Sequence, residues 1–238
     1  MVRVFTFLKL FEQFEHAKSM LEGRLRMNTL EYFREYRDVE GELRGDPYEG
    51  VHGILQPSQL SEITFDGHTI QAKDLAAPIL IHPTHVGAWN IFCMYAVSNA
   101  GLSEKVSADT LAELKKGLQI HEHCFGLGTH CVILTKPQEF LSRVRSALKA
   151  MGRGYRMKLV EYYDETSFHG FFPEEEVPFR KRLRFQTQRE YRVVMSNASD
   201  AAGALTLNVG DLSDIAKITT PSQFNADLRL ELPDGSSA

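Results

Sequence analysis

One segment, residues 89–97, limits the possible folds of this chain more than any other. Its sequence, WNIFCMYAV, carries no charge and is the most apolar stretch of the 238 residues. A continuous apolar run of this length, rich in aromatic and β-branched side chains, is typical of a strand that is buried on both faces. We therefore expect a central strand here, with further strands on either side of it.

Shorter alternating runs supply those further strands. They are predicted at residues 2–10, 25–27, 51–55, 62–65, 68–72, 78–81, 129–134, 155–163, 191–195, 204–209, 215–219 and 228–232. Asp66-Gly67, between two of these runs, is a strong signal for a two-residue hairpin turn. Helical spacing of apolar residues predicts helices at 11–21, 32–36, 107–118 and 137–151, with Gly23 ending the first and Ser107 capping the third. This mixture predicts one α+β domain over residues 1–232, followed by a disordered tail at 233–238.

The composition is that of a soluble globular protein. Apolar residues make up 43% of the chain, charged residues 24%, and the net charge is −4, which excludes a uniformly basic nucleic-acid clamp. No apolar run approaches the roughly 20 residues that a membrane span needs, and residues 1–10 are too short and too charged for a signal peptide. The three cysteines, an odd number, predict free thiols in a reducing cytoplasm.

Residues 180–195, RKRLRFQTQREYRVVM, contain the strongest candidate for a reaction site. Gln188 and Glu190 are two positions apart, which in an extended chain directs both side chains to one face. A carboxylate and an amide that share a face, beside several arginines, could act on an anionic substrate. The alternative, and the commoner meaning of this spacing, is the solvated face of an ordinary strand.

Six cationic side chains surround this motif: Arg180, Lys181, Arg182, Arg184, Arg189 and Arg192. The planar guanidinium group of arginine binds two phosphate oxygens at once. The run would therefore fit a diphosphate cofactor or an RNA backbone. A solvated surface without a ligand is again the alternative.

A polar loop upstream, residues 44–50, has the sequence RGDPYEG. Asp-Pro favours a turn, and the glycines free the backbone on either side. Loops of this kind carry function more often than they carry the core. The sequence leaves two interpretations, a well-made turn or one wall of a pocket closed by Arg44, Asp46 and Glu49.

A metal site is a minor hypothesis. Five residues are of the types that bind zinc: His121, His123, Cys124, His130 and Cys131. Their spacing does not match the usual pairs of zinc ligands. The cysteines lack a local nucleophile signature, and the glycine-rich and metal-binding motifs of common enzyme classes are absent.

Several segments together resemble a known family. They are the first strand with Lys9, GRLRMN leading to RGDPYEG, the apolar strand with Cys93 and Tyr95, FGLGTHCVILTKPQEFLSRV, and FRKRLRFQTQREYRVV. This order resembles a bacterial domain family that shares an Asn-Asp-Pro-x-Glu loop and a late Lys…Glu-x-Glu-Tyr-Arg strand. That family is similar to the ADP-ribosyltransferases, whose Gln/Glu-x-Glu motif is matched here by Gln188-Arg189-Glu190. Some relatives are toxins of toxin–antitoxin and anti-phage systems, and at least one such group modifies RNA.

The chain departs from the pattern of this family at three places. Gly45 stands where the family usually has asparagine, and the apolar strand reads Cys-Met-Tyr where many members read Cys-Phe-Ser. A transferase of this fold also needs an arginine or histidine on an early strand to hold the cofactor, and no histidine fills that place. Lys9, Arg24 and Arg26 remain the candidates.

The resemblance implies a split, mostly antiparallel sheet flanked by helices, and transfer of ADP-ribose from NAD to RNA rather than protein, with release of nicotinamide and without a metal. It implies that Glu190 stabilises the cationic ribose and that Gln188 orients the reactants. The remaining implied site residues are Lys9, Arg26, Tyr32, Arg44 and Tyr95 for NAD, and Arg180, Arg182, Arg184, Arg192, Asp46 and Glu49 for the acceptor. A neutralising antitoxin protein would be a partner. The alternatives are a non-catalytic module that binds nucleic acid or a protein, and a metal-dependent nuclease.

Overall fold

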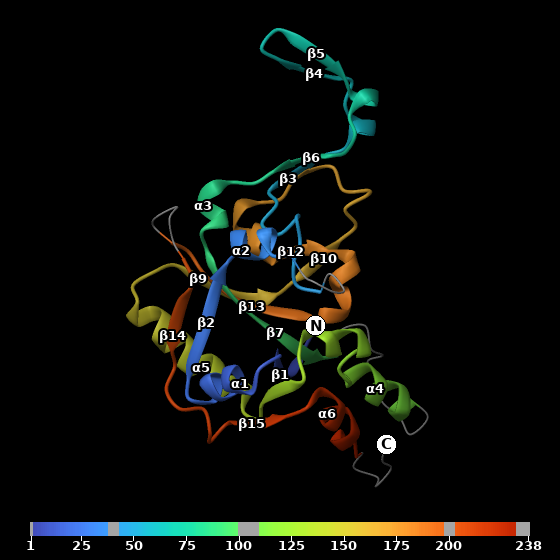
Figure 1. Ribbon diagram of the computed structural model, residues 1–238. Helices are drawn as coiled ribbons and strands as arrows, with labels where there is room; N and C mark the ends of the chain where they lie inside the picture. The colour runs from blue at the N-terminus through green and yellow to red at the C-terminus, as the bar shows by residue number, and fades with distance from the viewer. Residues whose placement is uncertain (1, 38–42, 100–109, 198–202, 232–238) are drawn as a thin grey trace.

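The computed structural model describes residues 2–37, 43–99, 110–197 and 203–231. The expected helix start at Ser107 and the expected tail at 233–238 lie outside these residues. Figure 1 shows helices and strands intermixed in one body, from which a hairpin extends as an arm. Within the described part of the chain, no helix is long and apolar enough to cross a membrane.

The apolar segment forms the central strand, as predicted. It is β7 (Asn90–Ser98), and all of its side chains except Cys93 are buried. Along one edge, β7 pairs with β13 (Glu190–Met195), from Asn90 opposite Met195 to Tyr95 opposite Glu190. Two strands share its other edge. β2 (Arg24–Thr29) pairs with residues 90–91 of β7, and β1 (Val4–Phe11) pairs with residues 95–98.

The sheet therefore splits along this shared edge. Among the described residues, no strand lies beside residues 92–94 of β7 on the side where β1 and β2 pair. β2 continues to β14 (Leu205–Asn208), β1 continues through β8 (His130–Leu134) to β15 (Ala216–Thr219), and β13 continues to β9 (Tyr155–Leu159). All of these pairings are antiparallel, which confirms the predicted α+β class with a mostly antiparallel sheet.

One continuous core covers one face of the sheet. α1 (Phe14–Leu21) and α5 (Pro137–Ala150) contribute buried apolar side chains to it. On α5 these are Phe140, Leu141, Val144 and Leu148, the spacing of a single helical stripe. They contact alternate residues of β1, β7 and β13.

The other face carries two smaller apolar clusters. The first includes Leu30 of α2 (Leu30–Glu35) and Val86 of α3 (Thr84–Gly87). The second includes Leu118 of α4 (Leu111–Leu118) and Phe224 of α6 (Pro221–Asp227). Because the apolar residues of this face form two separate clusters, polar side chains can lie on the same face, around the split in the sheet.

Three small sheets lie outside the main one. β3 (Gly53–Leu55), β6 (Ile79–Ile81) and β11 (Gly170–Phe171) form the first, and β10 (Glu161–Tyr163) pairs in parallel with β12 (Arg180–Arg182). β4 (Glu62–Phe65) and β5 (His68–Gln71) form the arm seen in Figure 1. The predicted hairpin turn is confirmed, because Asp66 and Gly67 have φ angles of 48° and 74°.

Three local predictions were wrong. The strand expected at 155–163 is two strands, because the pairing with β13 ends where the Val160 N–H donates to the backbone carbonyl of Glu190, and the chain then pairs with β12. The loop expected at 168–178 contains β11 and a 3₁₀ helix, Glu174–Phe179. The strand expected at 228–232 is not formed at residues 228–230, and α6 precedes it, begun by Pro221 and capped by the Thr220 hydroxyl.

Gly23 turns the chain from α1 into β2 with a φ of 85°, and a Cβ built there would lie 2.0 Å from the carbonyl oxygen of Gly210. We expect Gly23→Ala to lower the free energy of unfolding by about 2–5 kcal/mol, from left-handed strain and overpacking together. Gly152→Ala is the control, since Gly152 also has a positive φ but faces open space, and it should cost only about 1–2 kcal/mol. Urea denaturation measures both, and equal losses would contradict the importance of the Gly210 contact.

Candidate functional site

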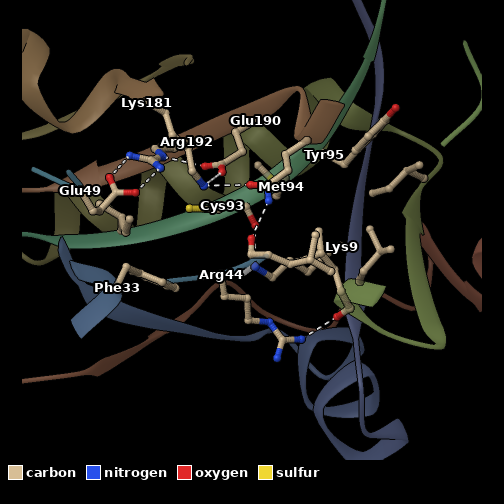
Figure 2. Close-up of a pocket in the computed structure, with 16 residues that line it drawn as sticks. Lys9, Phe33, Arg44, Glu49, Cys93, Met94, Tyr95, Lys181, Glu190 and Arg192 are labelled. Carbon is tan, nitrogen blue, oxygen red and sulfur yellow. Dashed lines mark hydrogen bonds and ion pairs between the residues drawn. The ribbon is translucent and has the colours of Figure 1, made fainter. Parts of the chain in front are cut away.

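A pocket of about 110 Å³ opens beside the split in the sheet. Its walls come from β1, β7, β12, β13 and the loop that begins at Leu43, and they include apolar residues of both clusters on this face. Figure 2 shows its polar side chains from these different elements converging. The charged or amide side chains are Lys9, Arg44, Glu49, Lys181, Gln188, Glu190 and Arg192.

Gln188 and Glu190 both line this pocket, but not because the chain is extended there. Gln188 ends a 3₁₀ helix, Leu183–Gln188, and Arg189 is left-handed with a φ of 42° before β13 begins. The prediction that an extended chain directs the two side chains was therefore wrong. They are brought together by Lys181, whose ammonium donates to Gln188 Oε1 at 2.8 Å and also to Glu190 Oε1.

Lys181 was counted in the cationic run but not among the predicted site residues, because in the sequence it stands among arginines. It is only 5% exposed, whereas Arg180 and Arg182 on either side of it are partly exposed. A short strand directs alternate side chains to opposite faces, so one member of the run had to point away from its neighbours. Strand alternation over residues 180–182 was therefore the sequence signal that could have predicted a buried Lys181.

Arg192 joins two carboxylates. Its guanidinium forms a bidentate pair with Glu49 at 2.6 and 3.0 Å, and its Nε donates to Glu190 Oε2 at 2.8 Å. A further bond reaches the carbonyl of Pro178 at 2.7 Å. The result is a row of alternating charge, Glu49, Arg192, Glu190 and Lys181, which Figure 2 shows with Arg44 across the pocket.

This row sets which carboxylate stays charged. Burial alone would raise the pKa of Glu190, but Arg192 and Lys181 outweigh it and hold that pKa well below the usual range. Burial raises the pKa of Glu49, although Arg192 opposes the rise. Burial would lower the pKa of Lys181, yet Glu190 and Glu49 outweigh it and raise that pKa. Glu190 is therefore the firmly ionised carboxylate of the pocket.

Lys9 is the cation placed to meet a ligand. Its Nζ donates to the Cys93 carbonyl at 2.7 Å, at the part of β7 where the sheet is split. It lies 5.0 Å from the centre of the Phe92 ring, and no carboxylate of the described residues pairs with it. Burial lowers its pKa. An ammonium without a carboxylate partner, at the edge of a pocket, suits an anionic group.

The other residues predicted to hold NAD are divided. Arg44 lines the pocket, where it pairs with Glu12 and donates to the Leu127 carbonyl at 2.6 Å. Tyr95 also lines it, and burial raises the pKa of its hydroxyl to about 12. Arg26 and Tyr32 are exposed on β2 and α2 and do not line this pocket. The structure therefore brings together three of the five.

The predicted acceptor surface is not one open basic patch. Arg180 pairs with Glu161 and Glu176, and Arg182 pairs with Asp46 at 2.8 Å and Glu165 at 3.5 Å. Asp46 is fully buried in that pair. Arg192 and Glu49 are each 1% exposed and line the first pocket instead, while Arg184 is exposed beside Phe185. Acidic residues, some nearby in the sequence and others such as Asp46 and Glu49 far away, thus neutralise most of the run.

The possible zinc ligands do not assemble. Over the described ranges, no group of three or more His, Cys, Asp or Glu side chains could hold a metal ion. Cys124 and Cys131 belong to an apolar cluster. Burial raises the pKa of Cys93 and of Cys124 to about 11, so both are protonated thiols at neutral pH.

The pocket as a whole presents an ionised carboxylate, Glu190, and an amide, Gln188, together with the cation Lys9, in a small space whose carboxylate and amide are buried. Charged groups act more strongly on a ligand in such a space than in water. This chemistry suits a substrate that has an anionic end and develops positive charge near the carboxylate. Comparisons of the chain with protein families, curated proteins and solved structures found no match.

Proposed function

We propose that the protein is an NAD-dependent ADP-ribosyltransferase that modifies RNA rather than protein and releases nicotinamide. The observation that carries the proposal is the convergence of Gln188 and Glu190 on Lys181, inside a pocket that Lys9 also lines. As a toxin of a toxin–antitoxin or anti-phage system it would act in the cytoplasm and be neutralised by an antitoxin protein. Its fold and charge pattern are compatible with this role.

The chemistry follows from the charges. Breaking the bond between nicotinamide and ribose leaves the bonding electrons on nicotinamide and builds positive charge on the ribose. The ionised Glu190 stabilises that charge and accepts a hydrogen bond from a ribose hydroxyl. Gln188 orients the sugar. A nucleophile of the acceptor then forms the new bond to the ribose carbon and releases its proton to the solvent.

The size of the pocket determines how NAD would enter. Ligand sites for whole cofactors usually measure about 300–1,000 Å³, and this cavity of about 110 Å³ is smaller. We assign it to the nicotinamide–ribose end alone, with Tyr95 beside the ring. The diphosphate would lie at Lys9 and Arg44. Of the three early basic residues, Lys9 is the one in the pocket, and Arg24 and Arg26 are not.

One observation favours a different class of function. Glu190 is already bound by both Lys181 and Arg192, and two cations weaken the attraction that it offers to a cationic sugar. A non-catalytic module with the same pocket would bind an anionic partner without chemistry. NAD separates the two proposals, because only a protein that binds it should gain thermal stability when it is added.

The decisive test uses labelled NAD with total RNA and total protein as separate acceptors. Label should enter RNA, nicotinamide should be released, and Glu190→Gln should reduce both by about 10²–10³-fold, the usual loss when a group that stabilises the transition state is removed. Glu62→Gln is the matched control, since Glu62 is exposed on the arm, and it should leave the rate unchanged. Unaltered transfer by Glu190→Gln would refute the role of Glu190. No label and no nicotinamide from the intact protein would support the binding module.

A further inference from the structure

A second and larger cavity, of about 790 Å³, adjoins the first. It opens where the chain enters β13, next to β9 and β10. Apolar residues of its lining include Val2, Leu159 and Val160, and polar ones include His121, Gln186 and Arg189. Glu190 lines both cavities. A group bound in the second cavity would therefore lie beside the residue that we assign to the sugar in the first.

The left-handed residue Arg189 separates the two cavities. Gln188 and Glu190 line the first, whereas Arg189 lines only the second. Its conformation is fixed on both sides, since the Arg189 N–H donates to the Gln186 carbonyl at 3.1 Å, the Ala96 N–H donates to the Arg189 carbonyl at 2.9 Å, and the Glu190 N–H donates to the Tyr162 hydroxyl at 2.8 Å. A non-glycine residue at positive φ is costly, and such residues cluster at functional sites.

Arg189 also carries the available positive charge of this cavity. Its guanidinium donates to the Gly117 carbonyl and lies 6.0 Å from the centre of the Tyr95 ring, and within the described residues no carboxylate pairs with it. Lys158, the other cation of the lining, is bound by Glu161 and Glu176. The cavity thus offers one cation without a carboxylate partner beside apolar surface, with the amide of Gln186 and the exposed ring of His121 nearby. Glu161 also lines it, but its carboxylate is paired with Lys158 and Arg180.

We propose that this second cavity binds one nucleotide of a single-stranded RNA acceptor, with its phosphate on Arg189 and its base against Leu159 and Val160. Single-stranded RNA is recognised by cationic groups that hold the backbone and by surfaces that receive unstacked bases. The volume is in the range that ligands of nucleotide size occupy. The inference rests on the proposed function, because it names the acceptor of that reaction. An acidic peptide would use the same cation but would not need the apolar surface.

The test measures binding of a short fluorescent single-stranded RNA by anisotropy, at low salt and without NAD. Arg189→Gly suits the positive φ and removes the whole side chain with its guanidinium, so it should weaken binding at least about tenfold and make the affinity less dependent on salt. Arg189→Lys should restore part of the affinity. Arg229→Gly is the matched control, because it removes an exposed arginine outside both cavities, and it should have little effect.

The outcomes separate this inference from the proposed function. Nicotinamide release in the absence of RNA reports the first cavity, and the control Arg229→Gly, outside both cavities, should leave it unchanged. If RNA affinity depends on Arg189 but the intact protein releases no nicotinamide, the second cavity stands and the transferase proposal fails. The inference would be overturned if Arg189→Gly bound RNA as strongly as the intact protein does. It would also be overturned if Arg229→Gly weakened RNA binding as much as Arg189→Gly does. Displacement of the RNA by an acidic peptide at equal concentration would point to a protein acceptor and overturn it as well.

Discussion

Replacing Arg192 with methionine is expected to lower the free energy of unfolding by about 3–5 kcal/mol. The guanidinium is 1% exposed and holds Glu49 and Glu190 together. Without it, Glu190 keeps only the ammonium of Lys181, and the buried carboxylate of Glu49 loses its ion pair. Urea denaturation, followed by circular dichroism, measures the loss as a lower midpoint with an unchanged slope.

Two further variants show whether the loss comes from the charges. Arg145→Met removes an exposed arginine of α5 and should change stability by no more than about 0.5 kcal/mol. Adding Glu49→Leu to Arg192→Met removes the carboxylate that would be left alone, so the double variant should recover part of the stability. An Arg192→Met protein as stable as the intact one would show that the buried row contributes little to folding.

Replacing Lys181 with methionine is expected to reduce the transfer rate about 100-fold, because misplacing a reacting group by about 1 Å costs this much. Lys181 acts as a positioning residue, since its ammonium holds Gln188 and Glu190 in one place. Arg192 still binds Glu190 in this variant, so circular dichroism should show a folded protein. The measurement is the rate of nicotinamide release, with saturating NAD to separate binding from chemistry.

The pH dependence of this rate gives a sharper readout. Glu190 works as a charged group, so activity is lost as pH falls through its pKa. In the intact protein that pKa lies well below the usual range, and activity should stay level through mildly acidic pH. In Lys181→Met, Arg192 and the more distant Lys9 still oppose the effect of burial on Glu190, but the ammonium bound directly to it is gone, so the pKa rises and the loss moves to higher pH. Lys181→Arg keeps the charge and should keep the loss at low pH. If Lys181→Met and the intact protein lose activity at the same acidic pH, the proposed role of Lys181 is refuted.

The main strands could be predicted because their pattern is local. β7 is read from its unbroken apolar run, and the hairpin turn from Asp66-Gly67, since each depends on neighbouring residues only. α6 was missed although Thr220-Pro221 is a helix start of a known kind, because the apolar residues after it suggested a strand. Those residues, Leu228 and Leu230, instead pack on the second apolar cluster.

The candidate site was predictable only in part, since it depends on contacts between distant residues. Nothing beside Gln188-Arg189-Glu190 in the sequence shows that Arg189 is left-handed, because that conformation is held by Ala96 and Tyr162. In the same way, Arg182 looks like a cation for an acceptor until the fold places Asp46 beside it. Charge patterns give the types of side chain in a site, and the fold decides which of them are left without partners.

The row of charges also has a consequence for the time at which the site appears during synthesis. Glu49 and Arg192 are 143 positions apart in the chain, and Lys181 and Glu190 come only shortly before Arg192. The ribosome makes the amino-terminal part first. A growing chain therefore exposes the loop that carries Glu49 first, and it cannot close the row until β13 has emerged. The pocket is therefore incomplete in every nascent chain that has not yet reached Arg192.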